Sequence, residues 1–220
     1  MKIIYWSDFN CPYSYIGLKR LSDAVEELNL NFEWKMKAYE LEPHLQNTVK
    51  SSVEREMEKF SITKKEALEE MMEVNEIALE SGLEIHWDKT PLVTSRHAHR
   101  LVKYTEKKDK TKVKEIIFKI YESKFKQCKN IADLKVLVDI AVSCGFDKNE
   151  VYDMLLSNSY NIEVEMDCED AHFNGLYSTP CYLFKIKNHQ LIIPHALEKE
   201  EFKNAIEDML NDEIINKTFL

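Results

Sequence analysis

The segment Cys11-Pro12-Tyr13-Ser14 has the spacing of a C-x-x-C redox motif, with serine in place of the second cysteine. A cysteine at the start of a helix has its sulfur near unpaired backbone N–H groups and the positive end of the helix dipole, which favour the thiolate. The thiolate is the nucleophile of disulfide exchange. Ser14 lies one helical turn further on, where its hydroxyl can donate to the sulfur but cannot attack a mixed disulfide. The motif predicts a nucleophilic cysteine without a partner cysteine, and an inert buried thiol is the alternative.

The elements around this motif are predicted from the spacing of apolar residues. Ile3 to Trp6 is an unbroken apolar run typical of a strand buried on both faces. A helix is predicted from about Pro12 to Leu28, with proline in its first turn. Residues 32–38 alternate between apolar and charged side chains, which predicts a half-buried strand. The motif therefore follows the first strand of a β-α-β unit.

The middle of the chain, from about 52 to 157, is predicted to be helical throughout. Thr63 and Glu66 form a capping box at the start of one helix. The apolar face of that helix is predicted to be buried as core rather than to line a ligand pocket; it comprises Leu68, Met71, Met72, Ala78 and Leu79. Two further apolar stripes, at 113–121 and 134–141, predict two more packed helices.

The end of the chain returns to mixed structure. A helix is predicted at about 158–174, then two strands, PCYLFKIK and QLIIP, joined by a turn at Asn188-His189, and a final helix at 198–210. This order predicts an α/β domain of residues 1–50 and 158–220, interrupted by an inserted helical domain of residues 51–157. Two separate domains in series are the alternative, but two short terminal pieces are not expected to be stable apart.

Composition excludes several classes of function. The chain has 220 residues, of which 44% are hydrophobic and 31% charged, and its net charge is -9. Nucleic acid is not expected as a partner, because phosphate binding needs a clustered positive surface. No apolar run is long enough to span a membrane or to form a signal-peptide core, so we expect a cytoplasmic protein. The five cysteines are widely spaced, which predicts neither a zinc site nor a disulfide framework.

A second segment, Tyr177 to Tyr182, places Thr179-Pro180 directly before a predicted strand. Proline is poorly tolerated inside a central strand, so a cis proline in a sharp entry turn is predicted here. An ordinary trans proline at an edge strand is the alternative.

These motifs together resemble the DsbA-like thioredoxin superfamily, in its FrnE-like branch, which is similar to the 2-hydroxychromene-2-carboxylate isomerases and the kappa-class glutathione transferases. The resemblance covers nearly the whole chain and implies a thioredoxin-like fold with an inserted all-helical domain. The family's D-x-x-C-P-W-C-Y-I-G matches residues 8–17, its F-x-L-x-P matches residues 39–43, and its A-H-R-L matches residues 98–101. The family's cis proline falls on Pro180.

The resemblance implies a thiol–disulfide oxidoreductase in which Cys11 forms a mixed disulfide and Ser14 stabilises the thiolate. Pro12, Tyr13, Thr179 and Pro180 are the implied substrate-binding residues. A disulfide-containing protein or a small thiol is the implied partner. Glutathione is the implied co-substrate, with no tightly bound cofactor and no metal.

Two departures from the family pattern keep other functions open. The second cysteine of the redox members is Ser14 here, and Cys11 occupies the place of the serine that activates glutathione in the isomerases and kappa transferases, which have S-P-Y-S there. Ile193-Pro194-His195-Ala196-Leu197 lacks the G-x-D-R of those glutathione-using relatives. A glutathione-dependent isomerase or transferase is the first alternative, and a non-enzymatic redox-sensing or binding module is the second.

Other residues could be mistaken for, or could extend, the site. His97 and His99 would share a face on a strand but point apart on the predicted helix, so metal binding is not expected. Cys181 follows the predicted cis proline and is a candidate resolving thiol, with a packed strand cysteine as the alternative. Asp8 and His195 are candidate proton carriers that spacing alone does not distinguish.

Overall fold

The computed structural model describes residues 1–45 and 49–212. The chain divides into two compact units, one made of Met1–Leu41 with Asp167–Leu220 and the other of Glu42–Met166. The first is an α/β unit and the second is mainly helical, so the predicted fold class, an α/β fold with a helical insertion, is confirmed. The domain boundaries at 50/51 and 157/158 stay a prediction.

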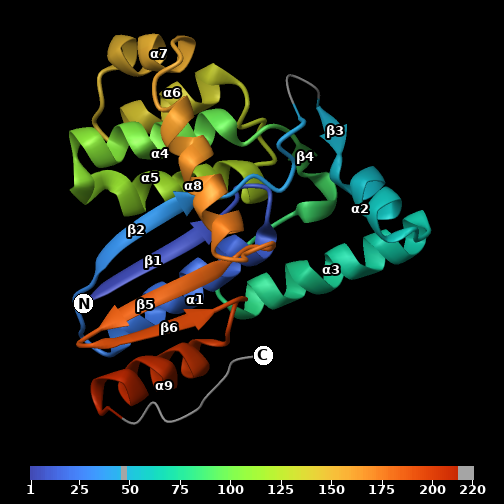
Figure 1. Ribbon diagram of the computed structural model, residues 1–220. Coiled ribbons are helices and arrows are strands. Elements are labelled where there is room, and N and C mark those ends of the chain that lie inside the picture. The colour runs from blue at the N-terminus through green and yellow to red at the C-terminus, as the bar shows by residue number, and fades with distance from the viewer. Residues whose placement is uncertain (46–48, 213–220) are drawn as a thin grey trace. The chain divides into compact units, whose positions relative to one another are not determined.

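The α/β unit is built on a four-stranded sheet in the order β2-β1-β5-β6 (Figure 1). Its strands are β1 (Lys2–Ser7), β2 (Glu33–Ala38), β5 (Cys181–Ile186) and β6 (His189–Ile193). β1 runs parallel to β2 and antiparallel to β5, and β5 runs antiparallel to β6. The apolar run of β1 is explained by this position, because the strand has neighbours on both edges and is covered on both faces.

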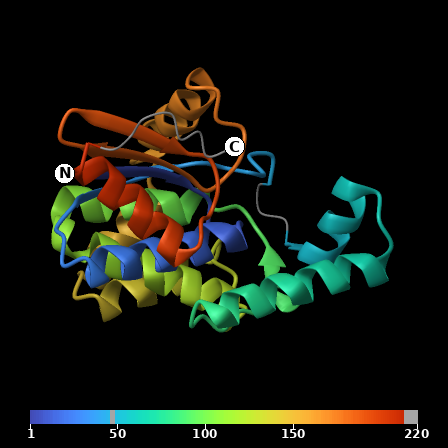
Figure 2. The ribbon, with the colours of Figure 1, turned by 90° about the horizontal axis from the view of Figure 1, so that it is seen from below.

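Helices cover both faces of this sheet. α1 (Pro12–Glu27) and α9 (Lys199–Leu210) pack against each other on one face, as the two views agree (Figures 1 and 2). On the other face, the end of α8 (Asn161–Phe173) packs Ala171 against Trp6 and Tyr39. α1 follows β1 after only four residues, so its first turn lies at the carboxyl end of the central strand.

The helical unit contains two groups of elements. One is the bundle of α4 (Arg96–Lys108), α5 (Val113–Tyr121), α6 (Leu134–Ser143) and α7 (Lys148–Leu156), with a π-helical turn at Glu122–Lys126. The other comprises α2 (Ser52–Phe60), α3 (Lys64–Glu80) and a two-stranded ladder of β3 (Lys50–Ser51) and β4 (Pro91–Leu92), with a short 3-10 helix at Trp87–Lys89. The capping box of Thr63 and Glu66 is present at the start of α3.

Three details of the sequence prediction are wrong. The middle segment is not purely helical, because β4 lies in it; a strand of two residues is too short to leave an alternating pattern. On α3, Met72 and Leu79 were predicted to be buried but are 58% and 68% exposed. The buried residues Met71 and Ala78 precede them by one position, which turns Met72 and Leu79 about 100° away from the buried face. The β5–β6 turn consists of Lys187 and Asn188, because Ile186 pairs with residue 189 in the ladder.

Gly17 lies where α1 approaches β5 most closely. A Cβ atom at this position would be 2.3 Å from the Tyr182 hydroxyl oxygen and 2.9 Å from the Cβ of Ala196. We therefore expect Gly17→Ala to lower the free energy of unfolding by about 1–3 kcal/mol in urea titrations, although alanine favours helix by about 1 kcal/mol. Adding Tyr182→Phe removes the nearest clashing atom and should recover part of the loss. A Gly17→Ala protein as stable as the wild type would contradict this packing.

Candidate functional site

Cys11 is placed by a tight connection between β1 and α1. It is the N-cap residue of α1, with extended backbone angles, and Pro12 occupies the first turn of the helix. The backbone N–H of Cys11 donates to the carbonyl of Asp8 at 3.1 Å. The buried Asp8 carboxylate accepts from the backbone N–H of Asn10 at 3.1 Å and from that of Leu41 at 2.7 Å. Asp8 therefore shapes the loop before the cysteine, and the Asp-x-Asn spacing of an Asx turn is the sequence signal for this role.

The structure brings Cys11 together with the segment before β5. The Cys11 thiol donates to the backbone carbonyl oxygen of Thr179, with 3.4 Å between sulfur and oxygen. The Thr179–Pro180 peptide bond is cis, as predicted, and Pro180 is buried. Only 6% of Cys11 is exposed. Two of the predicted site segments, 168 residues apart in sequence, thus meet at one sulfur atom.

The surroundings of Cys11 act on its pKa in opposite directions. Burial raises the pKa of the thiol and is the largest influence, while hydrogen bonds with Thr179 and Ser14 lower it and the nearby Asp8 carboxylate raises it. The net direction is upward. The expectation that the helix start lowers this pKa is therefore wrong for the free protein, because burial of the sulfur outweighs the hydrogen bonds that favour the thiolate.

This electrostatic balance predicts a pH profile. Because the thiolate is the reactive form and the Cys11 pKa is raised, alkylation by iodoacetamide should still be accelerating above pH 8.5, the usual pKa of a free thiol. The alkylation of the Cys11→Ser protein, measured in parallel, is subtracted to remove the contribution of the other four thiols. A rate that reaches its plateau near neutral pH would contradict the raised pKa.

The remaining residues of the predicted motif differ in exposure. Ser14 is 1% exposed, and its hydroxyl oxygen is buried. Its backbone N–H donates to the carbonyl of Cys11 at 3.2 Å. Pro12 is buried, whereas Tyr13 is 41% exposed beside the cysteine. Tyr13 is therefore accessible to a substrate, while Pro12 and Ser14 are not.

Cys181 lies on the opposite face of the sheet from α1. The hydroxyl of the next residue, Tyr182, reaches Gly17 of α1, and neighbouring residues of a strand point to opposite faces. Cys181 is paired across the ladder with Trp6, whose ring packs on the α8 side. Burial raises the pKa of Cys181 to about 11. We expect Cys181→Ser to leave the rate of any disulfide turnover unchanged within about twofold, and a tenfold loss would make Cys181 a resolving thiol.

The Ala98-His99-Arg100-Leu101 motif lies within the helical unit. Arg100 is 1% exposed, and its guanidinium donates to four backbone carbonyls around the end of α7, those of Met154, Leu155, Ser157 and Ser159. The same guanidinium lies 2.9 Å from Nδ1 of His97. The motif therefore caps a helix end, a role that its sequence does not indicate.

His97 and His99 lie on α4, as predicted. Within residues 1–45 and 49–212, no group of three or more histidine, cysteine, aspartate or glutamate side chains is arranged to hold a metal ion. His195, the other candidate proton carrier, is exposed after β6.

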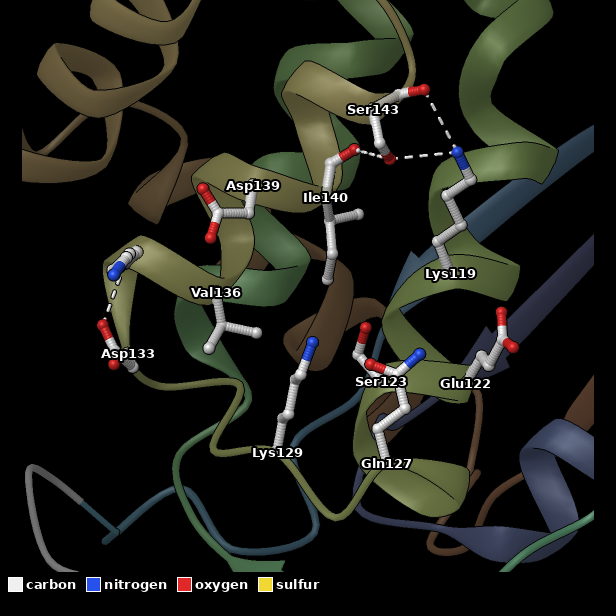
Figure 3. A pocket seen from close by; sticks show the side chains of 11 residues that line it. Lys119, Glu122, Ser123, Gln127, Lys129, Asp133, Val136, Asp139, Ile140 and Ser143 are labelled. Atoms are coloured by element: carbon white, nitrogen blue, oxygen red, sulfur yellow. Dashed lines mark hydrogen bonds between the residues drawn. The ribbon is translucent and has the colours of Figure 1, made fainter.

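A pocket of about 570 Å³ lies in the helical unit, between α6 and the π-helical turn (Figure 3). Lys119 closes one side by donating to the backbone carbonyl and hydroxyl of Ser143 at 3.2 and 3.0 Å. The lining has three lysines balanced by three carboxylates, and it contains no cysteine. None of the residues predicted for the thiol site lines it.

No helix in the described part of the chain is both long and apolar enough to cross a membrane.

Comparisons with known proteins identify the fold. The family model of the DSBA-like thioredoxin domain matches residues 2–207. A search of curated proteins found no significant match. Among solved structures, a probable DsbA oxidoreductase from Streptomyces coelicolor aligns with a TM-score of 0.86 and 21% identity, covering 99% of this chain and 93% of that one.

Two further structures share the fold at lower identity. The cytosolic disulfide reductase DsbM from Pseudomonas aeruginosa aligns with a TM-score of 0.69 and 13% identity, covering 96% of this chain and 99% of that one. A 2-hydroxychromene-2-carboxylate isomerase aligns with a TM-score of 0.67 and 14% identity, covering 98% of this chain and 100% of that one. With a family model that spans nearly the whole length, the chain belongs to the family of DSBA-like thioredoxin domains.

Proposed function

We propose that the protein is a thiol–disulfide oxidoreductase of the DsbA family that uses Cys11 as its single active-site cysteine. The observation that carries this proposal is the contact between the Cys11 sulfur, at the N-cap of α1, and the carbonyl of Thr179, next to cis Pro180. A substrate disulfide that approaches this sulfur meets the polypeptide on both sides, from the start of α1 and from the segment before β5.

The reaction takes place in two exchanges. The Cys11 thiolate attacks one sulfur of a substrate disulfide, the disulfide bond breaks, and the other sulfur leaves as a thiolate. An external thiolate, for which we propose glutathione, then attacks the substrate sulfur of the mixed disulfide. This second step breaks the bond to Cys11 and returns its sulfur as a thiolate. Ser14 stabilises that charge, while Thr179, Pro180, Pro12 and Tyr13 hold the substrate.

The proposed partners are a disulfide-containing protein or small molecule and a small thiol, and the proposed location is the cytoplasm. The structural relative DsbM supports the proposed small thiol and the proposed location. It is described as a cytosolic disulfide reductase and has also been solved with GSH. The five cysteines are all free, which agrees with a reducing compartment.

Trapping of the mixed disulfide tests the proposal. The wild-type protein, incubated with oxidised glutathione at alkaline pH, should gain the mass of one glutathione at Cys11, and excess reduced glutathione should release it. Cys181→Ser should gain the same mass, and Cys11→Ser should not. A wild-type protein that gains no glutathione, or a Cys11→Ser protein that gains as much as the wild type, would refute the single-cysteine mechanism.

A glutathione-dependent isomerase or transferase is the second candidate, and the buried hydroxyl of Ser14 favours it. That hydroxyl lies where the isomerases have the last serine of S-P-Y-S, and the isomerase structure shares the fold. This function requires reversible binding of reduced glutathione without covalent attachment. Calorimetry on Cys11→Ser, which cannot form a disulfide at this position, should then show saturable binding at millimolar glutathione, and its absence would exclude the candidate.

A further inference from the structure

A mainly apolar groove runs along α3, in the helical unit. Met72 and Leu79 lie seven residues apart on this helix, point in nearly the same direction and are 58% and 68% exposed. The buried side chains of Leu83 and Ile85, in the segment that follows the helix, contribute to the same lining. We call this pocket of about 280 Å³ the α3 groove.

Hydrogen bonds hold the segment that forms the second wall of the α3 groove. The side chain of Asn75 accepts from the backbone N–H of Trp87 at 3.1 Å and donates to the carboxylate of Asp88 at 3.4 Å. The backbone N–H of Leu83 donates to the carbonyl of Ala78 at 2.9 Å. The segment is therefore fastened to α3 at both ends. A groove that is formed in advance lowers the entropic cost of binding a partner.

A row of glutamates follows the exposed apolar side chains along α3. Glu69, Glu73, Glu76 and Glu80 have the spacing i, i+4, i+7 and i+11, which places them on one stripe of the helix surface. Glu69 forms an exposed ion pair with Lys65 at 3.6 Å. Within residues 1–45 and 49–212, the other three carboxylates have no cationic partner. The groove thus has one strongly acidic edge whose charge the described part of the chain leaves uncompensated.

This row of charge is unfavourable for α3 itself. Glu73 and Glu76 are three residues apart, and like charges at this spacing repel each other on a helix. Glu80 is the last residue of α3, at the negative end of the helix dipole, and the last turn contains no basic residue. A cationic partner would relieve the repulsion within the row and the repulsion from the dipole. Charge complementarity therefore favours a basic partner for this groove.

We propose that the α3 groove binds a basic amphipathic helix of another protein. Met72 and Leu79 are about 10 Å apart along the helix axis, which matches apolar anchors at i and i+7 of a partner helix. Lysine or arginine side chains beside those anchors pair with Glu73, Glu76 and Glu80 and accelerate association. A second copy related by a twofold axis would instead place the glutamates against their own counterparts. α3 contains no residue predicted for the thiol site, so the proposed function does not depend on this groove.

Fluorescence anisotropy with a labelled synthetic peptide tests the proposal on the full chain. The probe is a peptide of about 18 residues with leucines at i, i+3, i+4 and i+7 and lysines beside them, and its control is a scrambled peptide of the same composition. The probe should bind with a Kd of about 10–100 µM at low salt. The scrambled peptide should bind at least about tenfold more weakly, because it has the same charge without the apolar face.

Matched variants distinguish the groove from the overall negative charge of the protein. Glu76→Lys and Glu163→Lys change the net charge equally, but Glu163 lies on α8 and does not line the groove. Leu79→Ala and Ile162→Ala each shorten an apolar side chain that is 68% exposed. The two α3 variants should each weaken binding of the probe by about tenfold, and the two α8 variants by less than about twofold.

Three results would overturn the proposal. The first is no binding of the probe at about 1 mM, and the second is an equal loss of binding in the α3 and α8 variants. The third is a dimer in light scattering that Leu79→Ala dissociates, since the groove would then be an interface between copies of this chain. Circular dichroism checks the fold of each variant, and Glu76→Gln replaces Glu76→Lys if the latter does not fold.

Discussion

Replacing Cys11 with serine should lower kcat/KM for disulfide reduction by at least about a thousandfold. A serine hydroxyl stays protonated at every pH at which the protein is folded, and it cannot form a disulfide. The groups around the sulfur do not compensate, because the closest is the Thr179 carbonyl, which accepts a hydrogen bond but is not a base. The assay is the reduction of a glutathione–peptide mixed disulfide, followed through NADPH consumption by added glutathione reductase.

The matched control for this variant is Cys144→Ser. Cys144 is also a buried thiol whose pKa is raised by burial, but it lies at the end of α6 in the helical unit. Cys144→Ser should keep at least about half of the wild-type rate, since the substitution is small and lies in the other compact unit, far from Cys11 in sequence. If Cys11→Ser retained a tenth of the wild-type rate, or if the two variants lost activity equally, Cys11 would not be the nucleophile.

Replacing Arg100 with leucine should lower the free energy of unfolding by about 3–5 kcal/mol. The guanidinium supplies the donors for four backbone carbonyls around the end of α7, those of Met154 and Leu155 in buried hydrogen bonds, and leucine supplies none. Its positive charge also lies at the negative end of that helix, which is favourable. The unfolding free energy of Arg100→Lys should lie between those of the wild type and Arg100→Leu. An ammonium has fewer donors than a guanidinium and no planar fork. Urea titrations followed by circular dichroism measure the change.

Arg96 provides the control on the same helix. It forms an exposed ion pair with Glu165 at 3.0 Å, and such surface pairs contribute less than about 1 kcal/mol. Arg96→Leu should therefore lower the unfolding free energy by less than that amount. Equal losses for Arg96→Leu and Arg100→Leu would show that the hydrogen bonds of Arg100 do not stabilise the unit.

Local patterns predicted most of the fold because the features they describe are themselves local. The apolar run of β1, the proline in the first turn of α1 and the capping box of α3 each depend on a few consecutive residues. The exposure of Met72 and Leu79 could not be predicted in this way, because a residue beside the buried stripe is covered only if another element reaches it. The partners of Arg100 are carbonyls 54 to 59 residues away, which carry no sequence signal.

In the candidate site, too, the features set by a few consecutive residues were predicted, and those set by contacts between distant segments were not. Cys11, Ser14 and the Thr179–Pro180 pair were predicted from motif spacing and family resemblance, and the sequence also indicated the start of α1. The direction of the Cys11 pKa was missed, because the dominant influence is burial of the sulfur in the folded protein, which the local sequence does not show.

The distance in sequence between Cys11 and Thr179 has a consequence for synthesis of the protein. β1 receives its antiparallel neighbour β5 only after the whole helical unit has been made. At translation rates of about 5–20 residues per second, Thr179 follows Cys11 out of the ribosome by roughly ten to thirty seconds. During that interval the nascent chain carries Cys11 without the carbonyl that binds it and the segment that covers it. The thiol is thus most accessible to cellular oxidants before the protein is complete, and folding then buries it.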